Sequence, residues 1–157
     1  MCGPDNTNRP RGGALAALTS AKRFSSCHHV LEGDLAFHTP GQPGSCQATH
    51  ARFTPSEQCS LGELDTVDRL RVVIHSMGDM TKAAEDCGLF RQFTLCNERT
   101  SRRYFELPLE LPLSLEVGND GIIGRRVSLS WKTRSGSEGP VAEGIVGFNF
   151  LEPQSSV

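Results

Sequence analysis

The clearest pattern along the chain is a strict alternation of apolar and polar residues from Phe105 to Val117. The apolar parity consists of Phe105, Leu107, Leu109, Leu111, Leu113, Leu115 and Val117. Such alternation predicts a β-strand over 103–117 with one buried and one solvated face. Pro108 and Pro112 lie on the polar parity and have no backbone N–H, so they predict an edge strand or a bend.

Two further alternating segments follow, at 122–133 and 141–151. Between the first two strands, Asn119-Asp120-Gly121 has the composition of a three-residue hairpin loop whose Gly takes the left-handed conformation. These segments predict an antiparallel meander, which a fourth strand at 89–96 joins. The register that keeps apolar residues together pairs Leu113 with Val127, Leu111 with Leu129, and Leu109 with Trp131.

Helical signals lie before this region. Ser60 and Glu63 have the spacing of a capping box, which predicts a helix over 61–68 that passes into a strand over 69–76. A second short helix is predicted over Asp79–Cys87. Asp79 suits its N-terminus, and Gly88 suits its end.

Residues 1–60 contain five of the nine prolines and nine charged residues, and their apolar residues keep no period for long. They predict a flexible, Gly/Pro-rich arm, and residues 61–157 a folded domain. The predicted fold class is therefore α+β: an antiparallel β-meander of three to four strands with one or two short helices, preceded by a largely disordered N-terminal arm.

Composition narrows the functional classes. The chain has 157 residues and a net charge of −2. It has no apolar run long enough for a membrane helix, which needs about 20 residues, so no membrane contact is expected. The N-terminus lacks the apolar core of a secretory signal, so the six cysteines are interpreted as reduced thiols in an intracellular protein, cytoplasmic or nuclear. The Arg-, Ala- and Ser-rich segment 11–26 leaves organelle import as a less favoured alternative.

A Cys/His cluster offers one candidate site. Residues 27–59 hold seven of the eleven Cys and His residues, and zinc prefers thiolate and imidazole ligands. Cys46 and His50 could share one helical turn, and Cys27 with His29 could complete a tetrahedron. The favoured interpretation is nevertheless scattered thiols and imidazoles without a cofactor, with zinc as the alternative, because no CxxC spacing is present.

An arginine-rich edge offers a second candidate site. Arginine outnumbers lysine 13 to 3, and its planar fork suits phosphate and carboxylate. The predicted meander gathers Arg102, Arg103, Lys132 and Arg134 at one end of the sheet. They would bind an anionic partner, such as RNA or a phosphoprotein. The favoured alternative is a set of surface charges that keeps the edge from aggregating, since acidic residues lie nearby.

Some motifs resemble those of a known family. Arg103-Tyr104-Phe105-Glu106-Leu107-Pro108, then Asn119-Asp120-Gly121-Ile122-Ile123, then Val127-Ser128-Leu129 are similar to part of the α-crystallin domain of small heat-shock proteins. The resemblance implies a β-sandwich holdase that binds unfolding chains and oligomerises.

The favoured function is a non-enzymatic binding module that contacts a protein partner, or a second copy of itself, through the face or edge of the sheet. No phosphate-binding loop, nucleophile elbow, HExxH motif or dinucleotide fingerprint occurs, and no catalytic residues are predicted. Because the predicted core is modest, a dimer or a larger partner is expected to bury further apolar surface. The alternatives are a zinc-stabilised regulatory module over 27–59, a small-heat-shock-like holdase, and a nucleic-acid accessory protein that uses the arginine edge.

Overall fold

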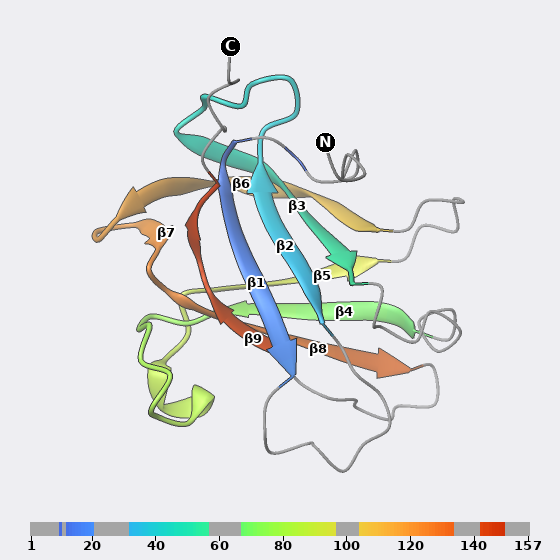
Figure 1. Ribbon diagram of the computed structural model, residues 1–157, viewed down its shortest axis with the longest axis vertical. Helices are drawn as coiled ribbons and strands as arrows, with labels where there is room; N and C mark the ends of the chain where they lie inside the picture. The colour runs from blue at the N-terminus through green and yellow to red at the C-terminus, as the bar shows by residue number, and fades with distance from the viewer. Residues whose placement is uncertain are drawn as a thin grey trace, which may run out of the picture.

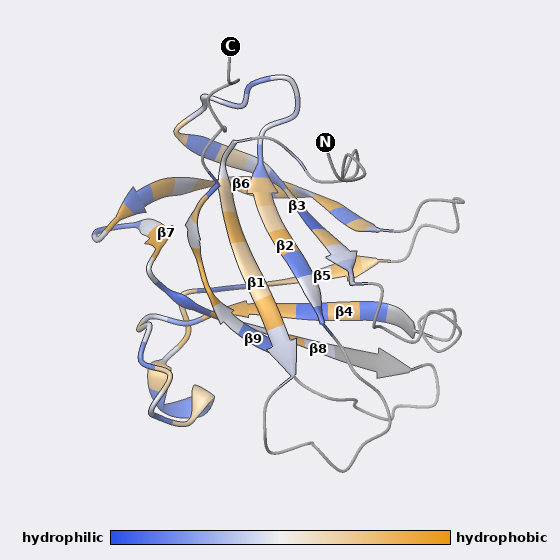
Figure 2. Ribbon diagram, viewed as in Figure 1, coloured by the Kyte–Doolittle hydropathy of each residue, from blue (hydrophilic) through white to orange (hydrophobic). Residues whose placement is uncertain are grey.

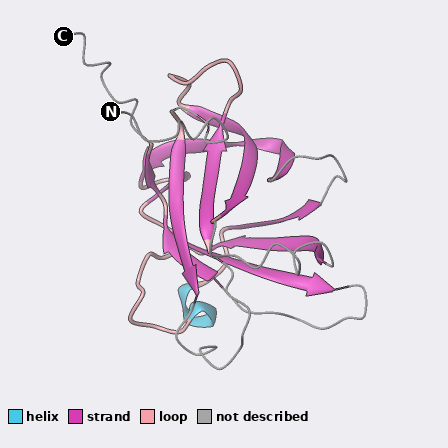
Figure 3. Cartoon of the chain, turned by 45° about the vertical axis from the view of Figure 1, so that its right-hand side comes forward, coloured by secondary structure: helices cyan, strands magenta, loops and turns pink. Residues whose placement is uncertain are grey.

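The computed structural model of the protein describes residues 10, 12–20, 32–56, 67–96, 104–133 and 142–149, with only the backbone described at 67, 68 and 131–133. This part of the chain is built almost entirely from β-strands (Figures 1 and 3). The strands are β1 Ala14–Ser20, β2 Gly33–His38, β3 Gln47–Pro55, β4 Val67–Ile74, β5 Arg91–Cys96, β6 Phe105–Val117, β7 Gly121–Ile123, β8 Arg126–Thr133, β9 Ala142–Ile145 and β10 Gly147–Phe148. One short 3-10 helix, η2, spans Ala84–Cys87.

The strands form a single hydrogen-bonded sheet in the order β5-β4-β8-β9-β1-β2-β3-β6-β7, and β10 pairs with β1 beside this path. All pairs are antiparallel except β6 with β7, which is parallel, so the sheet is mixed. β1 connects the two halves, because its first residues pair with β2 and β10 and its last two pair with β9.

The two halves of the sheet fold over one core. In Figure 1, β1 and β2 run along the long axis, whereas β4 and β8 lie across it. Phe37 of β2 and Phe53 of β3 belong to the same buried cluster as Leu70 of β4 and Leu129 of β8. Phe37 also meets Phe93 of β5 edge-to-face, with ring centroids 6.2 Å apart. Crossed sheet halves with side chains between them are one of the two usual ways in which sheets pack.

The predicted α+β fold class is wrong. The structure is a ten-stranded mixed sheet, and the three- to four-strand meander is not formed. β6 pairs with β3 and β7, while β8 pairs with β4 and β9, so the predicted β6–β8 register does not occur. The turn after Gly118 exists, with Gly121 N–H bonded to Gly118 C=O, but Gly118 and Asn119 take the positive φ values rather than Gly121. Gly124, with φ of 86°, follows the end of β7, and the chain then turns into β8 in the other half of the sheet.

Three strands form within residues 1–60, the segment in which a largely disordered N-terminal arm was predicted. β1, β2 and β3 lie within residues 1–60 and supply Leu18, Phe37 and Phe53 to the core. Their pattern escaped detection for physical reasons. β1 carries Ala on both parities, β2 is buried over four consecutive residues, and a bulge between Ala48 and His50 shifts the alternation of β3.

Of the two predicted helices, one lies mostly outside the described residues and the other forms only in part. Most of the predicted helix 61–68 lies outside the described residues, and residues 67 and 68 already belong to β4. Of the predicted helix Asp79–Cys87, only the 3-10 turn Ala84–Cys87 forms, and Gly88 ends it with a positive φ.

Several strands were predicted closely. β6 spans Phe105–Val117 against the predicted 103–117, and its register against β3 breaks between Pro108 and Leu113, where the prolines predicted a bend. A strand at 89–96 was expected next to the β6 segment; β5 forms over Arg91–Cys96, but its partner is β4. Between Pro108 and Leu113 the chain leaves Leu111 72% exposed, although its parity predicted burial.

Candidate binding surface

The connection between β4 and β5, residues 75–90, is named the cover loop, because it folds over the outer face of β8. Leu70, Val72 and Ile74 of β4 are buried in the core, so the next residue, His75, falls on the outer face. The same alternation in β8 buries Val127 and Leu129 and turns the polar residues between them outward. Arg126, Ser128 and His75 are nevertheless buried, because the cover loop lies over them.

Arg126 is the main attachment point of the cover loop. Its Nη1 donates to the backbone C=O of Lys82 at 2.7 Å and of Asp79 at 3.2 Å, and it lies 3.7 Å from the Sγ of Cys87. Its Nη2 forms an ion pair with Glu143 of β9. Burial alone would lower the pKa of Arg126, but the hydrogen bond to Glu143 and the charge of Glu143 outweigh burial and raise it. The guanidinium therefore remains a permanent cation that binds loop and sheet together.

His75 makes a second buried link. Its Nδ1 lies 2.9 Å from the C=O of Gly88, and a carbonyl can only accept, so Nδ1 carries the hydrogen. In a neutral ring Nε2 is then the acceptor, and it receives the hydroxyl of Ser128 at 2.8 Å. The pair resembles the Ser–His pair of hydrolases in its contacts, but the Ser128 side chain is enclosed beneath the loop, where the bond fixes the loop to β8.

Hydrogen bonds join the backbone of the cover loop to itself and to the sheet. Met77 N–H donates to the C=O of Cys87 at 3.1 Å, and Arg126 N–H donates to the C=O of Met77 at 3.3 Å. Arg125 of the β7–β8 turn donates to the C=O of Ser76 at 2.7 Å, while its guanidinium carbon lies 3.9 Å from the ring centre of Phe90. The loop is therefore held along its length by a rigid strand framework.

A glycine makes the close approach of this loop possible. A Cβ added at Gly78 would lie 2.1 Å from the C=O of Gly124, which is far inside van der Waals contact. The same position is 3.7 Å from Cδ1 of Ile145. Gly78 thus lets the loop rest directly on the β7–β8 turn and beside β9.

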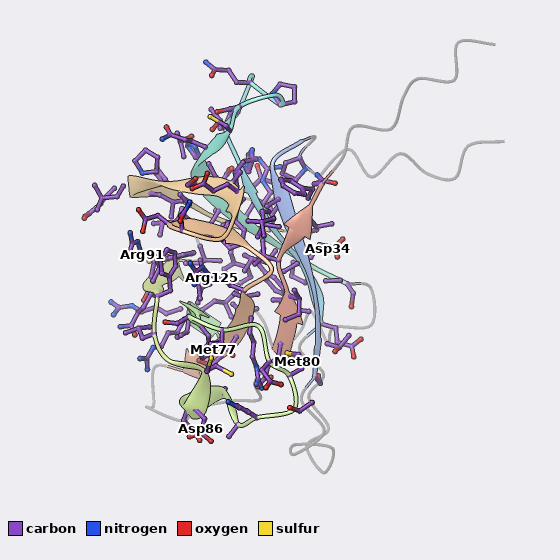
Figure 4. All side chains as sticks on the ribbon, turned by 90° about the vertical axis from the view of Figure 1, so that its left-hand side faces the viewer. Asp34, Met77, Met80, Asp86, Arg91 and Arg125 are labelled. Atoms are coloured by element: carbon purple, nitrogen blue, oxygen red, sulfur yellow. The ribbon has the colours of Figure 1, made fainter. Side chains whose placement is uncertain are left out.

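The fixed loop exposes apolar side chains. Met77 is 42% exposed and Met80 is 46% exposed, and both project from the loop in Figure 4. Ile145, which is the register partner of Arg126, is also exposed and lies next to Gly78. Met77, Met80 and Ile145 are named the methionine patch. Leu89, at the other end of the same loop, is 62% exposed.

A second polar cluster lies on the outer face of β2, β3 and β6. His38 Nε2 is 3.2 Å from Oε1 of Glu106, and Arg52 donates to both oxygens of Glu106 at 3.2 and 3.3 Å. The guanidinium carbon of Arg52 stacks 4.1 Å from the ring centre of Tyr104, and the rings of His38 and His50 are 5.9 Å apart. The cluster joins three neighbouring strands on the side opposite the core.

We expect this cluster to make stability depend on pH. Burial lowers the pKa of His38 below 6.5, and the charge of Arg52 lowers it further, while Glu106 acts in the opposite direction without outweighing them. Between the lowered pKa of the folded chain and the unfolded value of about 6.5, the unfolded chain therefore binds more protons than the folded chain. The free energy of unfolding falls as the pH is lowered through this range, by up to about 1.4 kcal/mol per pH unit from this group. Urea unfolding of the wild type and of His38→Gln at several pH values checks this. The variant should show the smaller slope, and equal slopes in the two chains would contradict the assignment.

The residues of the predicted zinc site are only partly described. Cys27 and His29 lie outside the described residues, so their part of the site stays a prediction. Cys46 is exposed just before β3, and His50 lies within it, with Nδ1 2.8 Å from Oγ1 of Thr49. The helical turn proposed for Cys46 and His50 is not formed, and an extended segment separates their Cα atoms by about 13 Å. Within the part of the chain that the structure describes, no group of three or more His, Cys, Asp or Glu residues could hold a metal ion.

The predicted arginine edge is described at one position. Arg102, Arg103 and Arg134 lie outside the described residues, and of Lys132 only the backbone is described. Lys132 belongs to β8 and pairs with Arg69 of β4, not with the strand that follows Arg103. The register that was expected to gather the four residues is therefore absent, although Lys132 has a basic neighbour.

The sequence patterns did not indicate Arg126, Glu143 or the methionine patch as site residues. Arg126 is recognisable only as a polar residue on the outward parity of a strand. Its partners come from residues 79–87 and from Glu143, so no local pattern connects them. The exposed methionines carry no sequence signal either, because isolated Met residues are common in cores.

Comparison with protein-family models finds no match, and comparison with curated proteins finds no significant match. No helix in the described ranges is long and apolar enough to cross a membrane.

Proposed function

We propose that the protein is a non-enzymatic interaction module that contacts a protein partner through the methionine patch on its cover loop. The observation that carries this proposal is the combination of a firmly attached loop with exposed apolar side chains. A loop attached only to keep the sheet closed would not need Met77 and Met80 at its surface. Loops positioned by a rigid scaffold commonly supply binding residues.

The chemistry of the patch suits a protein surface. Methionine is unbranched and polarisable, so it adapts its shape to an apolar partner and is overused at binding surfaces. The same loop also carries exposed polar residues, including Thr81, Glu85 and Asp86. An apolar patch with a polar rim is the usual composition of an interface. Arg126 and His75 fix the loop before a partner binds, so binding costs less conformational entropy.

Affinity enrichment with the tagged full-length chain tests this proposal. We expect Met77→Glu combined with Met80→Glu to reduce recovery of the specific partner proteins by about tenfold or more, the effect of losing one strong interface contact. Both positions are exposed, so the free energy of unfolding should change by less than about 0.5 kcal/mol per substitution.

Leu111→Glu provides the matched control, since Leu111 is an exposed apolar residue on β6. Partners that depend on the patch should be retained by this variant. Loss of the same proteins in both variants, or in neither, would contradict the proposal. Gel filtration of the same variants shows whether the bound partner is a second copy of the chain.

A further inference from the structure

The three adjacent strands β5, β4 and β8 have an unusual charge composition. Together they contain five basic residues and one acidic residue, Asp68. The basic residues are Arg69, Arg71, Arg91, Arg126 and Lys132. This excess contrasts with the whole chain, whose net charge is −2.

Two of these residues lie on the open part of the outer face. Leu70 and Val72 point into the core, so Arg69 and Arg71 project outward, and both are exposed. In register, Arg71 lies between Thr94 of β5 and Ser130 of β8, and Arg69 lies opposite Lys132. These neighbours offer hydroxyl groups and further positive charge. Figure 2 shows the corresponding hydrophilic bands on the first half of β4.

These arginines have no carboxylate partner in the described residues. The ion pairs of the described chain connect Glu106 to His38 and Arg52, and Glu143 to Arg126. Arg71 instead donates to the amide oxygen of Gln92 at 2.8 Å. Arg69 has a second basic residue, Lys132, as its register partner.

The spacing of the arginines indicates an extended ligand. Residues two apart on one strand repeat every ~6.6 Å, and carboxylates at alternate positions of an extended peptide have the same repeat. Each guanidinium can donate two parallel hydrogen bonds to one carboxylate. An acidic strand lying along β4 would therefore match both charges at once.

The same face is poorly suited to single-stranded nucleic acid. Its described outward residues are Arg69, Arg71, Val73, Gln92, Thr94, Cys96 and Ser130, and they include no aromatic ring. Phe93 faces the core and contacts Phe37. Base recognition on sheets depends on exposed aromatics for stacking. The charges here therefore favour carboxylates over nucleotides.

We propose that the outer face of β4, at Arg69 and Arg71, binds an extended acidic segment of a protein partner. This site is separate from the methionine patch. The two surfaces share no residue, so the proposal does not depend on the patch. The contact is electrostatic, so it should weaken as salt rises.

Fluorescence anisotropy with the full chain tests the site directly. The probes are an eight-residue Glu-Thr repeat, the matching Gln-Thr repeat and an eight-nucleotide single strand of DNA. At about 0.05 M salt we expect the Glu-Thr peptide to bind and the Gln-Thr peptide not to bind. Arg69→Glu and Arg71→Glu should each weaken the Glu-Thr peptide by about tenfold, the loss of one charge-assisted contact.

Arg91→Glu is the matched control. It makes the same charge change on β5, but Arg91 is the register partner of the core-facing Ile74 and so lies on the other parity. Retained binding in this variant supports the assignment, whereas an equal loss would show a response to net charge and overturn it. Preferred binding of the DNA, or no binding of the Glu-Thr peptide, would also overturn it. Circular dichroism confirms that each variant folds.

Discussion

Replacing Arg126 with methionine is expected to lower the free energy of unfolding by about 3–5 kcal/mol, the usual result of removing one member of a buried ion pair. The Arg126 and Glu143 side chains are only 6% and 13% exposed, so solvent screens their interaction weakly. The substitution leaves Glu143 without its cation and the carbonyl of Lys82 without its donor, while the carbonyl of Asp79 keeps only the thiol of Cys87. Chemical denaturation monitored by circular dichroism measures the loss.

Hydrogen exchange distinguishes a local from a global effect of this change. The amide of Met77, bonded to Cys87, should exchange faster in Arg126→Met, because the guanidinium no longer holds the cover loop at Asp79 and Lys82. Adding Glu143→Gln should recover part of the stability by removing the unpaired charge. Arg71→Met is the control on an exposed site. A loss below about 1 kcal/mol in Arg126→Met would show that the buried pair is not the main attachment.

If the cover loop presents the methionine patch, the same variant should also weaken partner binding. Met77 and Met80 would remain in place chemically, but the loop that carries them would sample more conformations. Under the proposed function the buried network and the exposed patch would act together, because the sheet supplies rigidity and the loop supplies contact.

The sequence allowed good prediction of individual strands and poor prediction of their partners. The Phe105–Val117 alternation located β6 closely, because one parity there is uniformly apolar and a period of two matches the strand repeat but not the helical one. Pairing is a nonlocal property, and the turn after Gly118 made a hairpin the simplest choice. The chain instead breaks at Gly124, a single residue whose positive φ no periodicity reveals.

The first three strands show a different limit. Ala14, Ala16 and Leu18 alternate as buried residues, but Ala17 stands on the exposed parity and blurs the contrast. In β3 the bulge after Ala48 moves the buried parity to Ala51, so no single phase fits the strand. Hydrophobic periodicity fails where small residues occupy both faces or where the backbone itself changes phase.

Substitutions at two leucines can distinguish the observed fold from the predicted hairpin. Leu129 is fully buried between β4 and β9, whereas Leu111 is 72% exposed on β6. We expect Leu129→Ala to lower the free energy of unfolding by about 2–5 kcal/mol, the range for a leucine whose loss leaves a cavity. Leu111→Ala should change it by less than about 0.5 kcal/mol. A β6–β8 hairpin would instead make the two residues core partners with comparable losses.

The double variant Leu111→Ala plus Leu129→Ala tests the strand order without depending on the size of either single effect on the free energy of unfolding. β6 and β8 are not neighbours in the sheet, so the effects of Leu111→Ala and Leu129→Ala should add to within about 0.5 kcal/mol. Residues that pack against each other across a hairpin would show a coupling energy above that margin, because the first cavity changes the cost of the second. Measurable coupling between the two leucines would therefore contradict the strand order, even if each single variant were destabilised by a separate local effect.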